Sequence, residues 1–175
     1  MKWQNLLIDV YKRMTSEVEE ILNGLTAADL HKRPSPGANP IGWLIWHVAR
    51  SMDRTLGDAV LGQQLWISEG WHKKFGMPPN PLDTGNGHTD AQVDALKIPD
   101  IQTLLDYYHS VMNAFLKRIE TLTEEDLDTE YPSSIQPGTK SAFYLRITSN
   151  MHDMMHVGQA GYVRGLIKGH RWYGR

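Results

Sequence analysis

The sequence contains no cysteine among its 175 residues. A disulfide framework, a zinc site built on thiolates and a cysteine nucleophile are therefore excluded. If the protein takes part in thiol chemistry, the thiol has to come from a separate molecule.

Long apolar runs are also missing. No stretch approaches the roughly 18 consecutive apolar residues that a membrane-spanning helix needs, so no such span is predicted. The N-terminal stretch carries Asp9, Lys12 and Arg13 where a signal peptide would have its apolar core. We therefore expect this stretch to belong to the fold and the protein to be cytoplasmic.

An excess of charge of either sign is absent as well. The net charge is −2, with 22% charged and 41% hydrophobic residues, which is typical of a soluble globular protein. Without a basic surplus, we expect neither nucleic acid nor a membrane as a partner. A chain of this length can bury a core of its own, so residues 1–175 are expected to form a single domain.

Apolar residues recur at helical spacing in four segments. The expected helices are Trp3–Asn23, Ile41–Leu61, Ile101–Leu122 and Ser141–Ile167. The pattern predicts an all-α fold, a four-helix bundle with one long crossover between helices two and three.

The crossover, Gly62–Asp100, is rich in glycine, proline and asparagine and is expected to hold only short turns. A connection of this length in a compact domain is usually either functional or disordered. Three large aromatic side chains favour a packed crossover, and a Thr-x-x-Gln pattern predicts a capped turn within it. These residues are Trp66, Trp71 and Phe75, and the pair Thr89 and Gln92.

A short repeat suggests that the bundle consists of two similar units. Gly24–Leu30 follows the first expected helix and Thr121–Leu127 follows the third, and each contains a Thr-x-x-Asp turn signal. In each unit the next long helix carries histidine. Helices two and four should therefore occupy equivalent places in the bundle.

The fourth expected helix carries a pair of histidines, His152 and His156, four positions apart. Side chains at this spacing leave the same face of a helix, so the two rings can bind one metal ion together. The face continues through Gln159 and Val163, which indicates that it points inward. Buried imidazoles need partners for their nitrogens, and a metal ion is an efficient shared partner.

His47 is the candidate for a third ligand because it lies in a very apolar part of the second helix, between Trp46 and Val48. If helices two and four are equivalent, His47 faces the His152–His156 pair. Three protein ligands with an open position are the pattern of catalytic zinc sites. The alternative is a hydrogen-bonded core histidine without a metal.

Three further residues are pocket candidates, each with a structural alternative. Arg50 lies one turn from His47 and either grips an anionic substrate or forms an ion pair, with Asp53 as its partner. Gln159 lies one turn past His156 and either orients a ligand or makes an ordinary polar contact. His88 either reaches over the site from its loop or marks a turn.

The remaining histidines are expected to play no part in the site. His109 is compatible with a core or an exposed position, and the others are expected at the surface: His31, His72 and His170. Trp43 and Trp46 flank His47 and are interpreted mainly as core residues that also wall the pocket.

The segment Pro34–His47 (PSPGANPIGWLIWH) and the segment His152–Gln159 (HDMMHVGQ) resemble the DinB-like superfamily, and the resemblance spans nearly the whole chain. The chain looks most similar to a branch common in actinobacteria, in which the first position of the pair is often not histidine. The resemblance implies a bundle that binds a divalent metal through His47, His152 and His156. Dimers are also common in the family.

The wider group includes mycothiol-dependent maleylpyruvate isomerase and bacillithiol transferases. The resemblance therefore implies a metal-dependent enzyme that transfers a low-molecular-weight thiol, or catalyses a related isomerisation or hydrolysis, on a small-molecule substrate. The alternatives are a metal- or small-ligand-binding protein without turnover, and a dimeric interaction scaffold. Zinc is the expected metal, with nickel and iron as alternatives, because imidazole suits all three.

Overall fold

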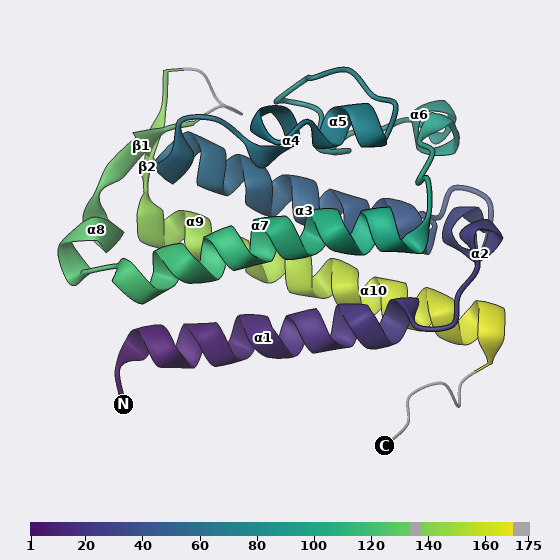
Figure 1. Ribbon diagram of the computed structural model, residues 1–175, viewed down its shortest axis with the longest axis horizontal. Coiled ribbons are helices and arrows are strands. Elements are labelled where there is room, and N and C mark those ends of the chain that lie inside the picture. The colour runs from purple at the N-terminus through teal and green to yellow at the C-terminus, as the bar shows by residue number, and fades with distance from the viewer. Residues whose placement is uncertain (134–137, 170–175) are drawn as a thin grey trace.

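The computed structural model describes residues 1–133 and 138–169, which form a bundle of four long helices with shorter elements at its periphery (Figure 1). The long helices are α1 (Trp3–Leu22), α3 (Ile41–Leu56), α7 (Ile101–Thr121) and α10 (Met151–Lys168). α1 packs on α7 and α10, and α3 packs on the same two helices from the other side. The prediction of an all-α four-helix fold is confirmed.

α3 is the central element, with fourteen of its sixteen residues buried. Its neighbours explain this burial, because α7 and α10 cover one part of its surface and the crossover covers the rest. An almost entirely apolar helix such as Ile41–Ala49 is stable in water only when it is surrounded in this way. Polar side chains on α3 therefore have to find partners inside the protein.

The crossover is packed, as its aromatic residues predicted. It contains three short helices: α4 (Leu65–Ser68), α5 (Trp71–Lys74) and α6 (Asp90–Ala95). The side chains of Trp66, Trp71 and Phe75 are buried and contact Tyr107 of α7. The predicted capped turn is present. The Thr89 hydroxyl accepts a hydrogen bond from the backbone N–H of Gln92, and the Gln92 side chain accepts one from the backbone N–H of Thr89.

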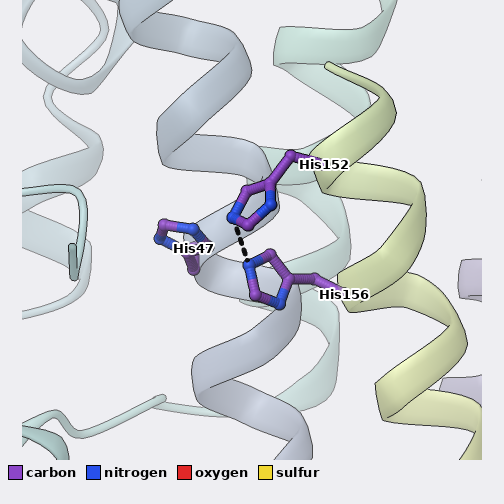
Figure 2. A group of neighbouring side chains, drawn as sticks. All are labelled: His47, His152 and His156. Atoms are coloured by element: carbon purple, nitrogen blue, oxygen red, sulfur yellow. Dashed lines mark hydrogen bonds between the residues drawn. The ribbon is translucent and has the colours of Figure 1, made fainter. Parts of the chain in front are cut away.

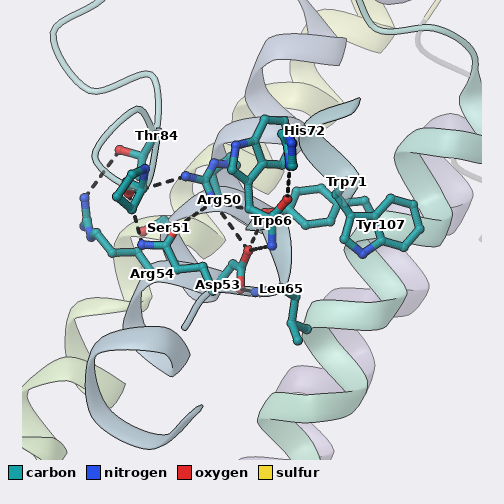
Figure 3. A network of polar contacts seen from close by, with 12 residues as sticks. Arg50, Ser51, Asp53, Arg54, Leu65, Trp66, Trp71, His72, Thr84 and Tyr107 are labelled. Carbon is teal, nitrogen blue, oxygen red and sulfur yellow. Dashed lines mark hydrogen bonds and ion pairs between the residues drawn. The ribbon is translucent and has the colours of Figure 1, made fainter. Parts of the chain in front are cut away.

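Arg50 anchors the crossover to α3 (Figure 3). Its side chain is fully buried, and its guanidinium donates to the backbone carbonyls of Asn80, Pro81 and Asp83. It also forms an ion pair of 3.4 Å with the buried carboxylate of Asp53. Of the two predictions for Arg50, the structure therefore shows the ion pair with Asp53. The N–H groups of its guanidinium are directed at the crossover.

The carboxylate of Asp53 binds the start of α4 in turn. Its two oxygens accept from the backbone N–H groups of Leu65 and Trp66 at 2.7 and 2.8 Å, and one of them also accepts from the Tyr107 hydroxyl at 2.8 Å. A buried ion pair is tolerated only when its remaining hydrogen-bonding capacity is used in this way.

The repeat is confirmed at its turns. α2 (Ala27–His31) and α8 (Glu124–Asp128) both begin with a capping box, formed by Thr26 with Asp29 and by Thr123 with Asp126. The units differ afterwards, because α8 is followed by a small antiparallel hairpin of β1 (Glu130–Pro132) and β2 (Lys140–Ala142).

Two predicted helices have different bounds in the structure. The second ends at Leu56 and continues as a π-helical turn, η1 (Gly57–Leu61). The fourth was predicted from Ser141, but that residue lies in β2, and the helical part is divided into α9 (Phe143–Ser149) and α10. The division falls at Asn150. Its backbone N–H donates to the carbonyl of Ile147, three residues earlier, where a regular α-helix would use the residue four positions earlier.

None of the helices in the described ranges combines the length and the apolar character that crossing a membrane requires. This agrees with the absence of long apolar runs in the sequence.

Arg50→Gln is predicted to lower the free energy of unfolding by about 3–5 kcal/mol, because it leaves Asp53 buried without its cation. Urea denaturation followed by circular dichroism measures this change. Arg13→Gln is the matched control, since Arg13 forms an exposed pair with Asp9 and its loss should leave the stability almost unchanged. Equal effects of the two substitutions would contradict a structural role for Arg50.

Candidate metal centre

His47 lies on the buried side of the site and its ring orientation is fixed by the crossover. The residue is only 6% exposed, and its Nδ1 donates to the backbone carbonyl of Thr84. A carbonyl oxygen only accepts hydrogen bonds, so the proton sits on Nδ1 and Nε2 carries the lone pair. This is the tautomer and second-sphere contact typical of metal-binding histidines.

The two histidines of α10 face His47 across the α3–α10 contact (Figure 2). Nδ1 of His156 contacts Oε1 of Gln159 at 2.7 Å, so its Nε2 also carries a lone pair. This Nε2 lies 2.9 Å from Nε2 of His152. The two nitrogens therefore face each other across a hydrogen bond in which His152 donates, and a metal ion would take the place of the proton between them.

The three histidines together offer ligand atoms that all lie within 4.8 Å of one another. Three nitrogens bound to one tetrahedral ion at about 2.0–2.1 Å would be separated by about 3.3 Å. Within residues 1–133 and 138–169, no cysteine, carboxylate or fourth histidine joins the group.

The site lies at the edge of the bundle, which corrects the prediction that the face of the pair points inward. His152 and Gln159 are exposed and His156 is half-buried, whereas the buried positions of α10 include Asp153 and Val157. α10 is therefore rotated so that the histidine pair borders solvent, with His47 beneath it. The rings of His152 and His156 can therefore be approached from solution, whereas His47 is buried.

Burial keeps the histidines in the state that binds metal. Removal from water lowers the pKa of His47 to about 4, with smaller contributions from the neighbouring histidines and Arg54. Burial also lowers the pKa of His156. Both rings are therefore neutral at pH 7, and only a neutral imidazole can coordinate a metal ion.

Trp43 forms a wall between His47 and His88. Its indole stacks on the His47 ring at 4.9 Å between centroids and meets the edge of His156 at 6.3 Å. Its Nε1 donates to Nδ1 of His88 at 3.2 Å, and Nε2 of His88 contacts the Asp83 carboxylate at 2.9 Å. Both nitrogens of His88 are thus engaged behind Trp43, outside the group of three.

Thr84 is the functional residue that sequence reasoning missed. Its carbonyl reaches His47 because the next residue, Gly85, has φ = 90° and packs against two indoles. A Cβ at this position would lie 2.8 Å from Trp43 and 3.0 Å from Trp46. The glycine in the Thr-Gly-Asn-Gly-His segment could therefore have predicted this contact, because only glycine lets the backbone come so close to a tryptophan-rich helix.

The other histidines lie away from the site. His31 is exposed as predicted, and its Nε2 contacts the Ile98 carbonyl at 3.1 Å. His72 is 9% exposed and bound to the Trp66 carbonyl, so its surface prediction was wrong because α5 packs into the crossover. His109 is half-buried and contacts Glu19 at 3.0 Å. His170 lies outside the described residues.

Comparisons with known proteins agree with the fold. The family model of the DinB superfamily matches residues 11–160. A solved structure described as a conserved protein of a locus from Enterococcus faecalis is 28% identical, with a TM-score of 0.83, and the match covers 97% of this chain and 99% of that chain. No curated protein matches the chain.

Gln159→Leu is predicted to weaken binding of a divalent metal by about 10–100-fold, because it removes the group that orients His156. Competition with a chromophoric chelator for zinc measures the affinity. Gln102→Leu is the matched control, since Gln102 bonds Asp106 on the exposed surface of α7. An unchanged zinc affinity in Gln159→Leu would show that Gln159 does not support the site.

Proposed function

Because this chain belongs to the DinB superfamily, we propose that it is a metal-dependent enzyme that holds one divalent ion through His47, His152 and His156. The observation that carries the proposal is the convergence of three histidines at a solvent-accessible edge, with no fourth protein ligand in the described part of the chain. Three protein ligands leave a coordination position for water or substrate.

Zinc is the proposed ion, with nickel and iron as alternatives for the same imidazole set. A bound ion of this kind polarises a carbonyl, or lowers the pKa of a coordinated water or thiol. The chain's own residues hold and shape the site. Thr84 and Gln159 orient His47 and His156, and Trp43 provides an apolar wall beside the open position.

The proposed reaction is the transfer of a low-molecular-weight thiol to a small-molecule substrate, or a related isomerisation or hydrolysis. The absence of cysteine supports an external thiol, because the chain has no thiol of its own to use. The net charge of −2 supports a small-molecule partner over nucleic acid or a membrane. The proposed compartment is the cytoplasm.

One alternative to the enzyme is a protein that binds a metal or small ligand through the same three histidines without turnover. The other is an interaction scaffold that binds no metal. The lack of a fourth protein ligand among the described residues favours the enzyme, because a purely structural metal site is usually closed by one.

The proposed oligomer is a homodimer, and its support is an exposed apolar stripe on α10. The stripe consists of Met151, Met155, Tyr162 and Leu166, which are between 57% and 70% exposed. Their spacing places them along one side of the helix. Pairing of α10 with its copy across a two-fold axis would cover this stripe on both chains.

Metal content tests the central proposal. The purified protein loaded with zinc at neutral pH is predicted to retain about one equivalent, and His47→Ala and His156→Ala are each predicted to lose it, since two imidazoles alone hold zinc weakly. His109→Gln is the control and should retain the metal. Elemental analysis after gel filtration, with circular dichroism as the check of folding, decides the outcome. Retention of zinc in both alanine variants would disprove the site.

The double substitution Tyr162→Lys/Leu166→Lys is predicted to convert a dimer into a monomer, because it places charges in the covered stripe. Sedimentation velocity measures the mass in solution. Tyr144→Lys removes an exposed aromatic residue of α9 and should leave the dimer intact. A native protein that sediments as a monomer would refute the dimer.

A further inference from the structure

A polar cavity lies further along α3 from the three histidines, and none of the three lines it. Its volume is about 210 Å³, and it lies between the end of α3 and the α9 region. Two arginines, one carboxylate and several hydroxyl groups line it. The lining residues that matter are Arg54, Thr55, Asp58, Ser141, Arg146 and Ser149.

The cavity and the metal centre share two facing stripes of side chains. On α3, His47, Ser51 and Arg54 follow one another at spacings of four and three residues, so they lie on one side of the helix. On the opposite wall, Ser149 precedes His152 by three residues. At 1.5 Å per residue, the arginine end lies about 10 Å from the histidine end along α3.

Thr84 connects the two ends directly. Its carbonyl accepts from His47, and its hydroxyl Oγ1 lies 3.4 Å from Nη1 of Arg54 (Figure 3). Arg54 is also close enough to His47 to contribute to the lowering of its pKa. Arg54, Thr84 and His47 therefore form a continuous line of polar groups between the cavity and the histidines.

The arginines of the cavity have hydrogen-bonding capacity to spare. Arg146 is 9% exposed and uses Nη2 for the carbonyls of Tyr131 and Pro132, both at 2.7 Å. Its buried Nε finds no hydrogen-bond partner in the part of the chain that the structure describes. Over the same residues, Arg54 makes a hydrogen bond of 3.4 Å to Thr84 and also interacts electrostatically with the carboxylates of Asp58 and Asp153. Buried donors of this kind favour an acceptor supplied by a ligand.

The charge of the lining selects the kind of anion. Arg54 and Arg146 carry two positive charges, and Asp58, which lies 3.5 Å from Arg146, carries one negative charge. One positive charge remains, which matches a singly charged carboxylate better than a doubly charged phosphate. The planar guanidinium fork also fits the two oxygens of a carboxylate.

We propose that this cavity binds the carboxylate of the substrate whose reacting group lies at the three histidines. The assignment rests on the proposed function and specifies its substrate class: an acid with its reactive centre several bonds away from the carboxylate. Arg54 and Arg146 bind the carboxylate, and Ser149, whose hydroxyl donates to the Arg146 carbonyl at 2.8 Å, forms part of the cavity wall.

Matched pairs of small thiols test the assignment on the cobalt-loaded protein. The probes are the straight-chain mercaptocarboxylates from mercaptopropionate to mercaptooctanoate, each with the mercaptoalcohol of equal length. Visible absorption of the cobalt ion reports binding of the thiol. For the best-fitting length, the carboxylate is predicted to bind about tenfold or more tightly than the alcohol, as expected for charge-assisted hydrogen bonds.

Arg54→Gln is predicted to remove this preference to within about twofold, and Arg54→Lys to restore part of it, because lysine keeps the charge without the fork. Arg13→Gln, an exposed arginine of α1, is the control and should keep the full preference. Cobalt content and circular dichroism are measured for each variant, so that loss of metal or of folding is distinguished from loss of carboxylate binding.

The outcomes separate the two proposals. Equal binding of carboxylates and alcohols at every length would overturn the cavity assignment and leave the metal centre intact. A stronger preference for mercaptoalkyl phosphates would overturn the choice of carboxylate. If no metal binds, the proposed function fails, and the cavity is then tested alone by NMR titration of hexanoate into the metal-free protein. Binding that Arg54→Gln abolishes supports the cavity, and binding that it leaves unchanged overturns it.

Discussion

The hydrogen bond from His47 to the carbonyl of Thr84 is the contact on which the arrangement of the site depends. It places the proton on Nδ1 and directs the free nitrogen of a buried ring towards α10. The two residues are 37 positions apart, so the contact forms only when the crossover is packed on α3. A segment with little regular structure therefore determines the orientation of the most buried histidine.

The crossover can do this because a buried cation holds it in place. Arg50 lies one turn from His47 on α3 and binds three carbonyls of the crossover, while Asp53 binds the start of α4. These backbone groups belong to a stretch rich in proline and glycine, which cannot satisfy them through regular secondary structure. The same helix thus carries both the anchor of the crossover and the histidine that the crossover orients.

The rotation of α10 determines what the site can do. The helix buries Asp153 and Val157 and leaves His152 exposed, so the histidine pair lies at the edge of the bundle above the buried His47. Further along α3, a separate cavity is lined by Arg54 and Ser149, where guanidinium and hydroxyl groups take the place of imidazoles. One end is suited to a metal ion and the other to an anion, as a site for a bifunctional small molecule requires.

Several features were predictable from the sequence because they depend on neighbouring residues. Helical spacing of apolar residues located the four long helices, Thr-x-x-Asp marked the capped turns, and the spacing of His152 and His156 placed both rings on one face. The apolar surroundings of His47 and the equivalence of helices two and four added His47 to the group, and the resemblance to a known family implied the same three residues. Bounds were less accurate at Ser141 and Leu56, where a β-hairpin and a π-helical turn replace regular helix.

The sequence by itself determined the helical class, the capped turns and the three histidines, because periodicity and side-chain chemistry are local properties. Only the tertiary structure decided that His72 is buried, that Arg50 faces the crossover, that His88 lies behind Trp43 and that the histidine pair borders solvent. These outcomes depend on which residues distant in the chain come into contact. Burial and hydrogen bonding arise from those contacts, and no spacing within one helix specifies them.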